Sequence, residues 1–396
     1  MTYNADLTVA VPLELVDEFL RKLPYISEAL AEFELEPESR TRVLFKLSSA
    51  DAEQAMIISA RIAETARKMC HNHRPGEAKV LVDNLFRPVS GVDDPHLLLE
   101  ASGELFRYGA GRYGLGPECL MLLEFFDRRF VQLAKQFSAV PHQYPNMIGA
   151  DTLDRCKYFQ SFPHSLSLVS HLREDLEALQ TFAKTVRWDG SRLNYDAESL
   201  SDVQCLLAPA VCFHCYSWLH DRDLKEPTVV TAVGRCFRYE STNLTGLERL
   251  WDFTMREIVF IGPKDYVLSQ RRKAIDEVVS ILDEWGMAYD IRSATDPFFI
   301  EEYSAQTAFQ SAFDLKYEIQ ALLPYKSKTL AVGSFNHHQD FFGRSFNIKI
   351  AGGELAHTGC AAFGLERLVL AFIAQHGTER GGWPAAVIKG VERLSC

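Results

Sequence analysis

A thiol and a guanidinium lie close together in the stretch AHTGCAAFGLERLVLAF, residues 356–372. Apolar residues recur at Leu365, Leu368 and Phe372, which is the spacing of one face of a helix and places Arg367 in its first turn. A helix N-terminus favours anions, and a guanidinium can hold two phosphate oxygens at once. The stretch is therefore compatible with a phosphate site. Taken alone it favours an arginine that caps the helix or pairs with an acidic side chain, so the neighbouring residues decide between the two.

A second group of polar residues occurs in GRCFRYESTNLTGLERLWDFTMREIVFIG, residues 234–262. Arg238 and Glu240 are two apart on a predicted strand, so they are expected on the same side of it. The following loop carries Arg249, and the return strand carries Phe253. One such pair could be a surface salt bridge, but several converging arginines and an aromatic ring favour a site for a nucleotide triphosphate.

The composition limits the class of protein. With 396 residues we expect about two domains, and the net charge of −11 gives no overall positive field for tRNA or DNA. No basic and apolar leader and no apolar run of membrane length are found, so neither a signal peptide nor a membrane span is expected. The nine cysteines form no disulfide framework, which predicts a reducing, cytoplasmic location.

The elements that position these residues fall into two predicted units, an accessory α+β domain at 1–95 and a larger domain at 96–396. The segment PVSGVDDPH at 88–96 has the composition of a connector. In the larger domain we expect an amphipathic helix at 116–137 and then a sheet with helices packed on it, in which 228–241 and 255–262 are neighbouring strands. Five elements are expected in the accessory domain: a strand at 7–11, a helix from Leu13, a strand at 40–49, a helix at 51–69 and a strand near 79–86.

These motifs resemble those of the class II aminoacyl-tRNA synthetases. The segment CFRYE, its loop and FTMREIVFIG resemble motif 2, and GLERLVLAF resembles motif 3. YEIQALLP and GSFNHHQDFFGRSFNIKI resemble the seryl-type pattern, whereas YPNMIGADTLDRCKYFQSFPHSL and LAPAVCFHCYSWL resemble the amino acid:[carrier protein] ligases, which are truncated relatives of the zinc-dependent seryl-tRNA synthetases of methanogens. The resemblance covers roughly residues 100–396 and implies an α+β fold, an antiparallel sheet flanked by helices.

The resemblance also implies a catalytic zinc, one per chain, held by Cys212, Glu257 and Cys360. Two thiolates and one carboxylate leave a fourth tetrahedral position open, which in this family takes the substrate α-amino group. The CFHC segment could instead be half of a structural zinc site through Cys215, but the sequence has no second CxxC. We predict that Cys215 is a packing residue, since residues three apart on a strand face opposite sides.

For ATP, the resemblance places Arg238 at the α-phosphate, Arg249 and Arg367 on the pyrophosphate side, Phe253 under the adenine, and Glu240 against the adenine or an arginine. Glu318 matches the position that binds magnesium between ATP phosphates, and Asn336 and Arg344 match residues that line the pocket. Adenylate formation needs no base, because the attacking carboxylate is already ionised at neutral pH. Three histidines are therefore predicted to be structural or loop residues: His214, His337 and His338.

The expected function is the ATP-dependent activation of a small amino acid (glycine, alanine or serine) as an aminoacyl-adenylate, followed by transfer to the phosphopantetheine thiol of a carrier protein. One alternative is a zinc-dependent seryl-tRNA synthetase, supported by the basic segments RTRVLFK and ARKMCHNHR but opposed by the acidic net charge. Another is a non-catalytic regulator, which the intact motif residues oppose. A homodimer is expected to form through the helix 119–137 and the YPNMIG strand.

Overall fold

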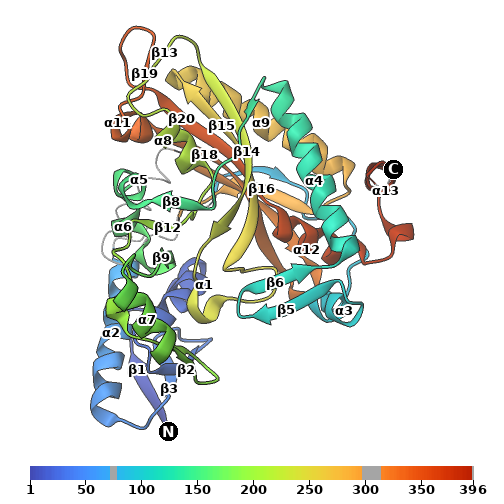
Figure 1. Ribbon diagram of the computed structural model, residues 1–396. Helices are drawn as coiled ribbons and strands as arrows, with labels where there is room; N and C mark the ends of the chain where they lie inside the picture. The colour runs from blue at the N-terminus through green and yellow to red at the C-terminus, as the bar shows by residue number, and fades with distance from the viewer. Residues whose placement is uncertain (72–77, 297–313, 395–396) are drawn as a thin grey trace.

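An eight-stranded sheet organises the protein (Figure 1). The computed structural model describes residues 1–71, 78–296 and 314–394. Neighbouring strands are antiparallel except for β7 and β14, which are parallel. The strand order is β4 (Val80–Asp83), β16 (Tyr289–Ser293), β17 (Lys316–Leu323), β18 (Lys328–Gln339), β20 (His357–Gly364), β15 (Asp252–Gly262), β14 (Thr228–Phe237) and β7 (Val140–Pro141).

Three long helices cover one face of this sheet: α4 (Pro117–Gln136), α9 (Lys264–Glu284) and α12 (Leu365–His376) (Figure 1). Their apolar residues form the main core with the strands, and the ring of Phe130 on α4 stacks on Phe363 of β20 at 3.8 Å between centroids. Trp285, at the end of α9, is fully enclosed in the same core. The expected antiparallel sheet flanked by helices is confirmed.

Side chains alternate across the sheet, and this alternation separates the core from the other face. On β15, Ile258 and Phe260 pack in the main core, whereas Val259 packs in a second core on the opposite face. Glu257 and Phe253 are an even number of residues from Val259, so they belong to that opposite face. The predicted strand pair is therefore correct, and it presents its polar residues away from the helices α4, α9 and α12.

No helix in the described part of the chain has the length and apolar character needed to cross a bilayer.

Shorter elements surround the eight-stranded sheet and its three long helices, and several of them form small sheets. The shorter elements are α3 (Pro95–Ala101), β5 (Leu105–Gly109), β6 (Arg112–Leu115), β8 (Met147–Gly149), α5 (Ala150–Arg155), α6 (Tyr158–Ser161), β9 (Leu168–Val169), α7 (Leu176–Thr185), β10 (Arg187–Trp188), β11 (Leu193–Asn194), β12 (Cys205–Leu207), α8 (Cys212–Trp218), β13 (Asp223–Leu224), α11 (Phe341–Ser345), β19 (Lys349–Ile350) and α13 (Ala385–Glu392).

The N-terminal segment forms its own small sheet and core, with strand order β1–β3–β2. Its elements are β1 (Thr2–Asp6), α1 (Leu13–Lys22), β2 (Leu30–Leu35), β3 (Arg42–Leu47) and α2 (Ala52–Cys70). The two helices and the strand within 40–49 were predicted correctly. The predicted strand at 7–11 is wrong, because pairing with β3 ends at Asp6, opposite Arg42. Leu7 and Val11 are instead buried in the loop that leads to Pro12 and α1.

Strand β4 does not belong to that small sheet. It pairs with β16 at the edge of the eight-stranded sheet, with Asp290 opposite Asp83. The division at residue 95 remains a prediction, and on the basis of this pairing we propose that the boundary between the two units falls before Val80.

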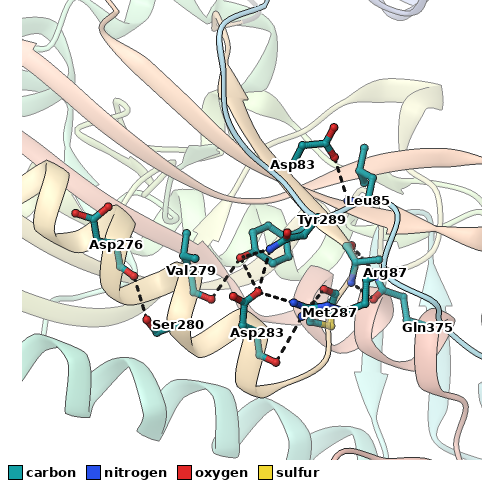
Figure 2. Close-up of polar contacts among 12 residues, drawn as sticks. Asp83, Leu85, Arg87, Asp276, Val279, Ser280, Asp283, Met287, Tyr289 and Gln375 are labelled. Carbon is teal, nitrogen blue, oxygen red and sulfur yellow. Dashed lines mark hydrogen bonds and ion pairs between the residues drawn. The ribbon is translucent and has the colours of Figure 1, made fainter.

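Residues after β4 are fixed to the C-terminal end of α9 by a cluster of polar contacts around Asp283 (Figure 2). One carboxylate oxygen of Asp283 accepts hydrogen bonds from Asn84 Nδ2 (3.0 Å), Arg87 Nη2 (2.9 Å) and the Tyr289 hydroxyl (3.1 Å). Arg87 also donates to the Met287 carbonyl at 3.1 Å. The chain between the two units is therefore anchored to the large sheet and its helix rather than free.

Asp283→Ala is expected to lower the free energy of unfolding by about 1 to 2 kcal/mol, because it leaves three donors without their shared acceptor. The matched control is Asp276, two turns earlier on α9. Within the described ranges, its side chain pairs with the exposed Arg272 alone. Asp276→Ala should change stability by less than about 0.5 kcal/mol. Urea unfolding of both variants measures the difference, and equal stabilities would show that the Asp283 cluster does not anchor the connector.

Candidate active site

Two thiols and a carboxylate meet on the face of the sheet opposite α4, α9 and α12. Cys212 is the first residue of α8, Glu257 lies on β15, and Cys360 lies on the adjacent β20. The Cys212 thiol interacts with both the Cys360 sulfur and the Glu257 carboxyl, and all three residues are buried. The structure thus brings together the three residues that the sequence analysis combined. Cys360 lies inside the strand β20, among the small residues of the stretch 356–372.

The carboxyl of Glu257 is incompletely satisfied in this group. Its Oε1 accepts a hydrogen bond from the Val211 N–H at 3.3 Å, while Oε2 is buried without a hydrogen-bond partner among the described residues. Burial, and then the negative charge of Cys360, raise the pKa of Glu257 to about 8. A cation beside Oε2 would remove this penalty, since a buried carboxylate needs a counter-charge or donors.

The sulfur of Cys360 has polar neighbours of its own. Asn336 Nδ2 donates to it at 3.3 Å, and His338 Nε2 lies 3.9 Å away. Hydrogen bonding from Cys212, together with His338 and Asn336, lowers the pKa of Cys360. The donor types in the group match a zinc site. No three His, Cys, Asp or Glu side chains stand at metal-binding spacing in the part of the chain that the structure describes, so zinc belongs to the proposals below.

Cys215 requires a correction. The CFHC segment is the start of helix α8 and not a strand, so Cys212 and Cys215 are on the same side of one helical turn. The reason given for separating the two thiols was therefore wrong. Cys215 is fully buried, and its thiol interacts with the Tyr144 hydroxyl.

The arginine and the ring of motif 2 lie together beside the end of β14. The Arg238 guanidinium lies over the Phe253 ring, 5.4 Å from its centroid, and its Nε donates to the Pro209 carbonyl at 2.9 Å. Strand β14 ends at Phe237, so Arg238 and Glu240 do not share a strand as predicted. They are nevertheless electrostatic neighbours, because the chain turns at Glu240 into the short helix η4 (Ser241–Asn243).

The remaining nucleotide candidates form a second part of the site. Arg249 makes an ion pair with Glu240. Arg367, in the first turn of α12 as predicted, donates to the backbone carbonyls of Glu248 (2.7 Å) and Ala331 (3.0 Å). Burial, followed by the positive charge of Arg249, lowers the pKa of Arg367 to about 10. Neighbouring guanidinium groups that disfavour each other are typical of a site that receives an anion.

Glu318 faces the same side of the sheet but is already engaged. Its Oε1 makes an ion pair with Lys316 at 2.8 Å, and its Oε2 accepts a hydrogen bond from Gln320 at 2.8 Å. Lys316 makes a second ion pair with Asp296 at 2.7 Å. The sequence analysis missed Lys316 and Gln320. The sequence contained a signal for both residues. They lie two positions before and two positions after Glu318 on one strand, and residues at i and i+2 share a face.

Arg344, on α11, lies apart from the other candidates. Its side chain is 71% exposed and bonds Asp340, the residue before that helix, so its place in the pocket stays a prediction. His338, predicted to be a structural or loop residue, lies on β18 against the Thr358 hydroxyl at 3.1 Å and beside Cys360. His337 lies on the opposite face and contacts His357 at 3.2 Å.

The fold and these sequence motifs agree with known proteins. Residues 195–376 match the family described as tRNA synthetase class II core domain (G, H, P, S and T). A solved structure of seryl-tRNA synthetase from Methanopyrus kandleri, in complex with Aquifex aeolicus tRNASec, superposes with a TM-score of 0.72 at 21% identity, over 99% of this chain and 77% of that chain. At this identity the superposition shows the fold alone. The protein therefore has a class II synthetase fold and core.

Relatives found by sequence identify the family of the chain more narrowly than the fold does. Amino acid--[acyl-carrier-protein] ligases 1 and 2 of Bradyrhizobium diazoefficiens are 33% and 34% identical to it over 251 and 256 residues, covering 62% of this chain and 74% and 72% of those proteins. The type-2 serine--tRNA ligase of Methanopyrus kandleri is 26% identical over 300 residues, 72% of this chain and 57% of that protein. The chain belongs to the amino acid--[acyl-carrier-protein] ligase family, and it is an enzyme of the ligase class.

Proposed function

We propose that this enzyme activates a small amino acid with ATP and transfers it to the phosphopantetheine thiol of a carrier protein. The observation that carries the proposal is the position of two groups on one face of the sheet. Among the Cys212, Glu257 and Cys360 donors, Glu257 is an electrostatic neighbour of Arg238. Arg238 is in turn a neighbour of Arg367, and both arginines are candidates for binding the phosphates. Such an arrangement holds an amino acid by one end and ATP by the other. The names of the Bradyrhizobium relatives support the carrier protein as acceptor.

Zinc fits the donor group, because Glu257 Oε2 is buried next to two thiols and has no hydrogen-bond partner in the part of the chain that the structure describes. We propose one zinc per chain, held by Cys212, Glu257 and Cys360. When bound there, zinc would supply an open position for the neutral α-amino group of the substrate. Asn336 and His338 contact the Cys360 sulfur and orient it for that role.

The chain's own residues then act on ATP. Phe253 offers a ring face to the adenine, and Arg238 neutralises charge at the α-phosphate. Arg249 and Arg367 bind the pyrophosphate side, and Glu318 is the carboxylate on this face for magnesium that enters with ATP. Glu240 orients Arg249 through their ion pair. Magnesium would have to share Glu318 with Lys316, since that carboxylate is paired in the structure.

The proposed reaction has two steps. In the first, a carboxylate oxygen of the amino acid attacks the α-phosphorus, the bond to the bridging oxygen breaks, and pyrophosphate leaves. No base is required, because the carboxylate is ionised at neutral pH. In the second, the acceptor thiolate attacks the carbonyl carbon of the adenylate, AMP leaves, and a thioester forms. We propose glycine, alanine or serine as the substrate, on the resemblance set out above.

Transfer to tRNA is the second candidate, favoured by the relationship to type-2 serine--tRNA ligases. The net charge of −11 opposes transfer to tRNA, since tRNA binding requires the neutralisation of many phosphates.

A homodimer that forms through α4 and the β8 region also remains a prediction.

The acceptor can be tested with labelled amino acids. Pyrophosphate exchange across a panel of amino acids should first identify the substrate in the absence of any acceptor. We then expect label on a carrier protein that bears its phosphopantetheine group. The same carrier without that group, and bulk tRNA, should stay unlabelled, because neither presents the phosphopantetheine thiol. Label on tRNA, with none on the phosphopantetheine-bearing carrier, would instead support a tRNA synthetase function.

A further inference from the structure

The N-terminal module, defined as β1 to α2, reaches the candidate active site through the end of its first helix. In Figure 1, α1 lies beside the loop that joins β14 to β15. Asn243 of this loop donates through Nδ2 to the backbone carbonyl of Arg21, in the last turn of α1, at 2.9 Å. The Tyr25 hydroxyl, just after α1, also interacts with the Asn243 side chain. The module therefore touches the same loop that carries Arg249.

The side chain of Arg21 is half-buried at this contact. Arg249 and Glu240 are both electrostatic neighbours of its guanidinium. Asp17 and Glu18, one turn earlier on α1, are also electrostatic neighbours of the guanidinium. Asp17 pairs with Lys328 at 3.5 Å and Glu18 with Lys22 at 3.6 Å. Among the residues that the structure describes, none makes a hydrogen bond or ion pair with the Arg21 guanidinium.

The charges around Arg21 indicate what it could bind. Burial, followed by the positive charge of Arg249, lowers the pKa of Arg21, so the two cations disfavour each other. Arg249 is in turn a neighbour of Arg367. This row of three guanidinium groups, from Arg21 through Arg249 to Arg367, lies in a chain of net charge −11. An anion with several negative oxygens placed along the row would relieve the repulsion, and a phosphate is the natural partner of a guanidinium.

We propose that Arg21 is a phosphate-binding residue of the active site, contributed by the N-terminal module. The proposal rests on the proposed function, which gives the site two phosphate sources: the β- and γ-phosphates of ATP, and the phosphate of the carrier's phosphopantetheine arm. In either case the module serves the reaction directly and completes the edge of the site next to the loop 241–250.

The first test measures binding of ATP with magnesium to the full-length protein by calorimetry, without amino acid or acceptor. If ATP is the source, Arg21→Ala should raise the Kd by about tenfold or more, because it removes a charge-assisted hydrogen bond. Arg21→Lys should recover part of the affinity, since it keeps the charge but not the fork. Arg42→Ala is the matched control, because Arg42 is an exposed arginine of the same module that pairs with Asp6 at 2.6 Å. This assay needs no turnover, so it is independent of the proposed transfer reaction.

The second test covers the other source. If ATP binding is unchanged, Arg21→Ala should raise the KM for 4′-phosphopantetheine as the acceptor, but not the KM for pantetheine, which lacks the phosphate. Docking of the module should survive the substitution, because Asn243 binds the Arg21 backbone carbonyl, and a thermal melt checks that the variant is folded. Unchanged ATP affinity together with an unchanged KM for 4′-phosphopantetheine, in a folded variant, would overturn the proposal.

Discussion

Cys360→Ala protein is expected to contain almost no zinc, whereas the unmodified protein is expected to contain one zinc per chain. Pyrophosphate exchange should fall at least about 100-fold, because the amino acid loses the group that fixes its carboxylate toward ATP. Cys212→Ala and Glu257→Ala should behave in the same way, since each removal leaves too few ligands for an open tetrahedral site. Metal analysis of the purified variants and exchange assays with the preferred amino acid provide the two measurements.

The matched control for the zinc prediction is Cys215→Ala. This thiol is one helical turn from Cys212 and fully buried, but its neighbour is the Tyr144 hydroxyl. The Cys215→Ala variant should keep its zinc. Loss of zinc from it, or near-stoichiometric zinc in Cys360→Ala, would show that the proposed ligand set is wrong. Thermal unfolding separates metal loss from misfolding, because a folded variant without zinc keeps a cooperative transition.

Arg238→Ala is expected to keep its zinc but lose activity. The rate of adenylate formation should fall by about 10²- to 10³-fold, as it does when a preorganised donor to a developing charge is removed. Binding of the amino acid alone should be unaffected, because Arg238 stands on the ATP side of the site. Single-turnover formation of the adenylate, followed by quenching, measures the step directly.

Arg222→Ala is the control for the loss of an arginine stacked on an aromatic ring. Its guanidinium lies 4.7 Å from the centroid of Trp218, much as Arg238 lies over Phe253, but it has no place in the proposed site. It should retain normal adenylate formation. If Arg238→Ala is equally active, the α-phosphate role belongs to another residue, and Arg367 would be the next candidate to substitute.

Much of the frame could be predicted from the sequence because it depends on local patterns. The continuous apolar, β-branched and aromatic run within 255–262 identifies β15. The spacing of Leu365, Leu368 and Phe372 identifies α12 and places Arg367 in its first turn. The elements that were predicted wrongly are short segments. The CFHC residues of α8 are few and rich in Cys and aromatic side chains, a composition compatible with a strand or a buried helix. Cys360 lies among small residues that suggest a turn, yet pairing on both sides makes β20 a central strand.

The sequence by itself determined which residue types could do chemistry and which long elements carry several of them, because period and side-chain type are local properties. Tertiary structure decided which of them meet. Cys212, Glu257 and Cys360 come together only through the packing of α8 and the register of β15 with β20. Long-range pairing likewise sets Arg21 beside Arg249, through the docking of one unit on another. Such contacts depend on the packing of apolar surfaces far apart in the chain, which no local period encodes.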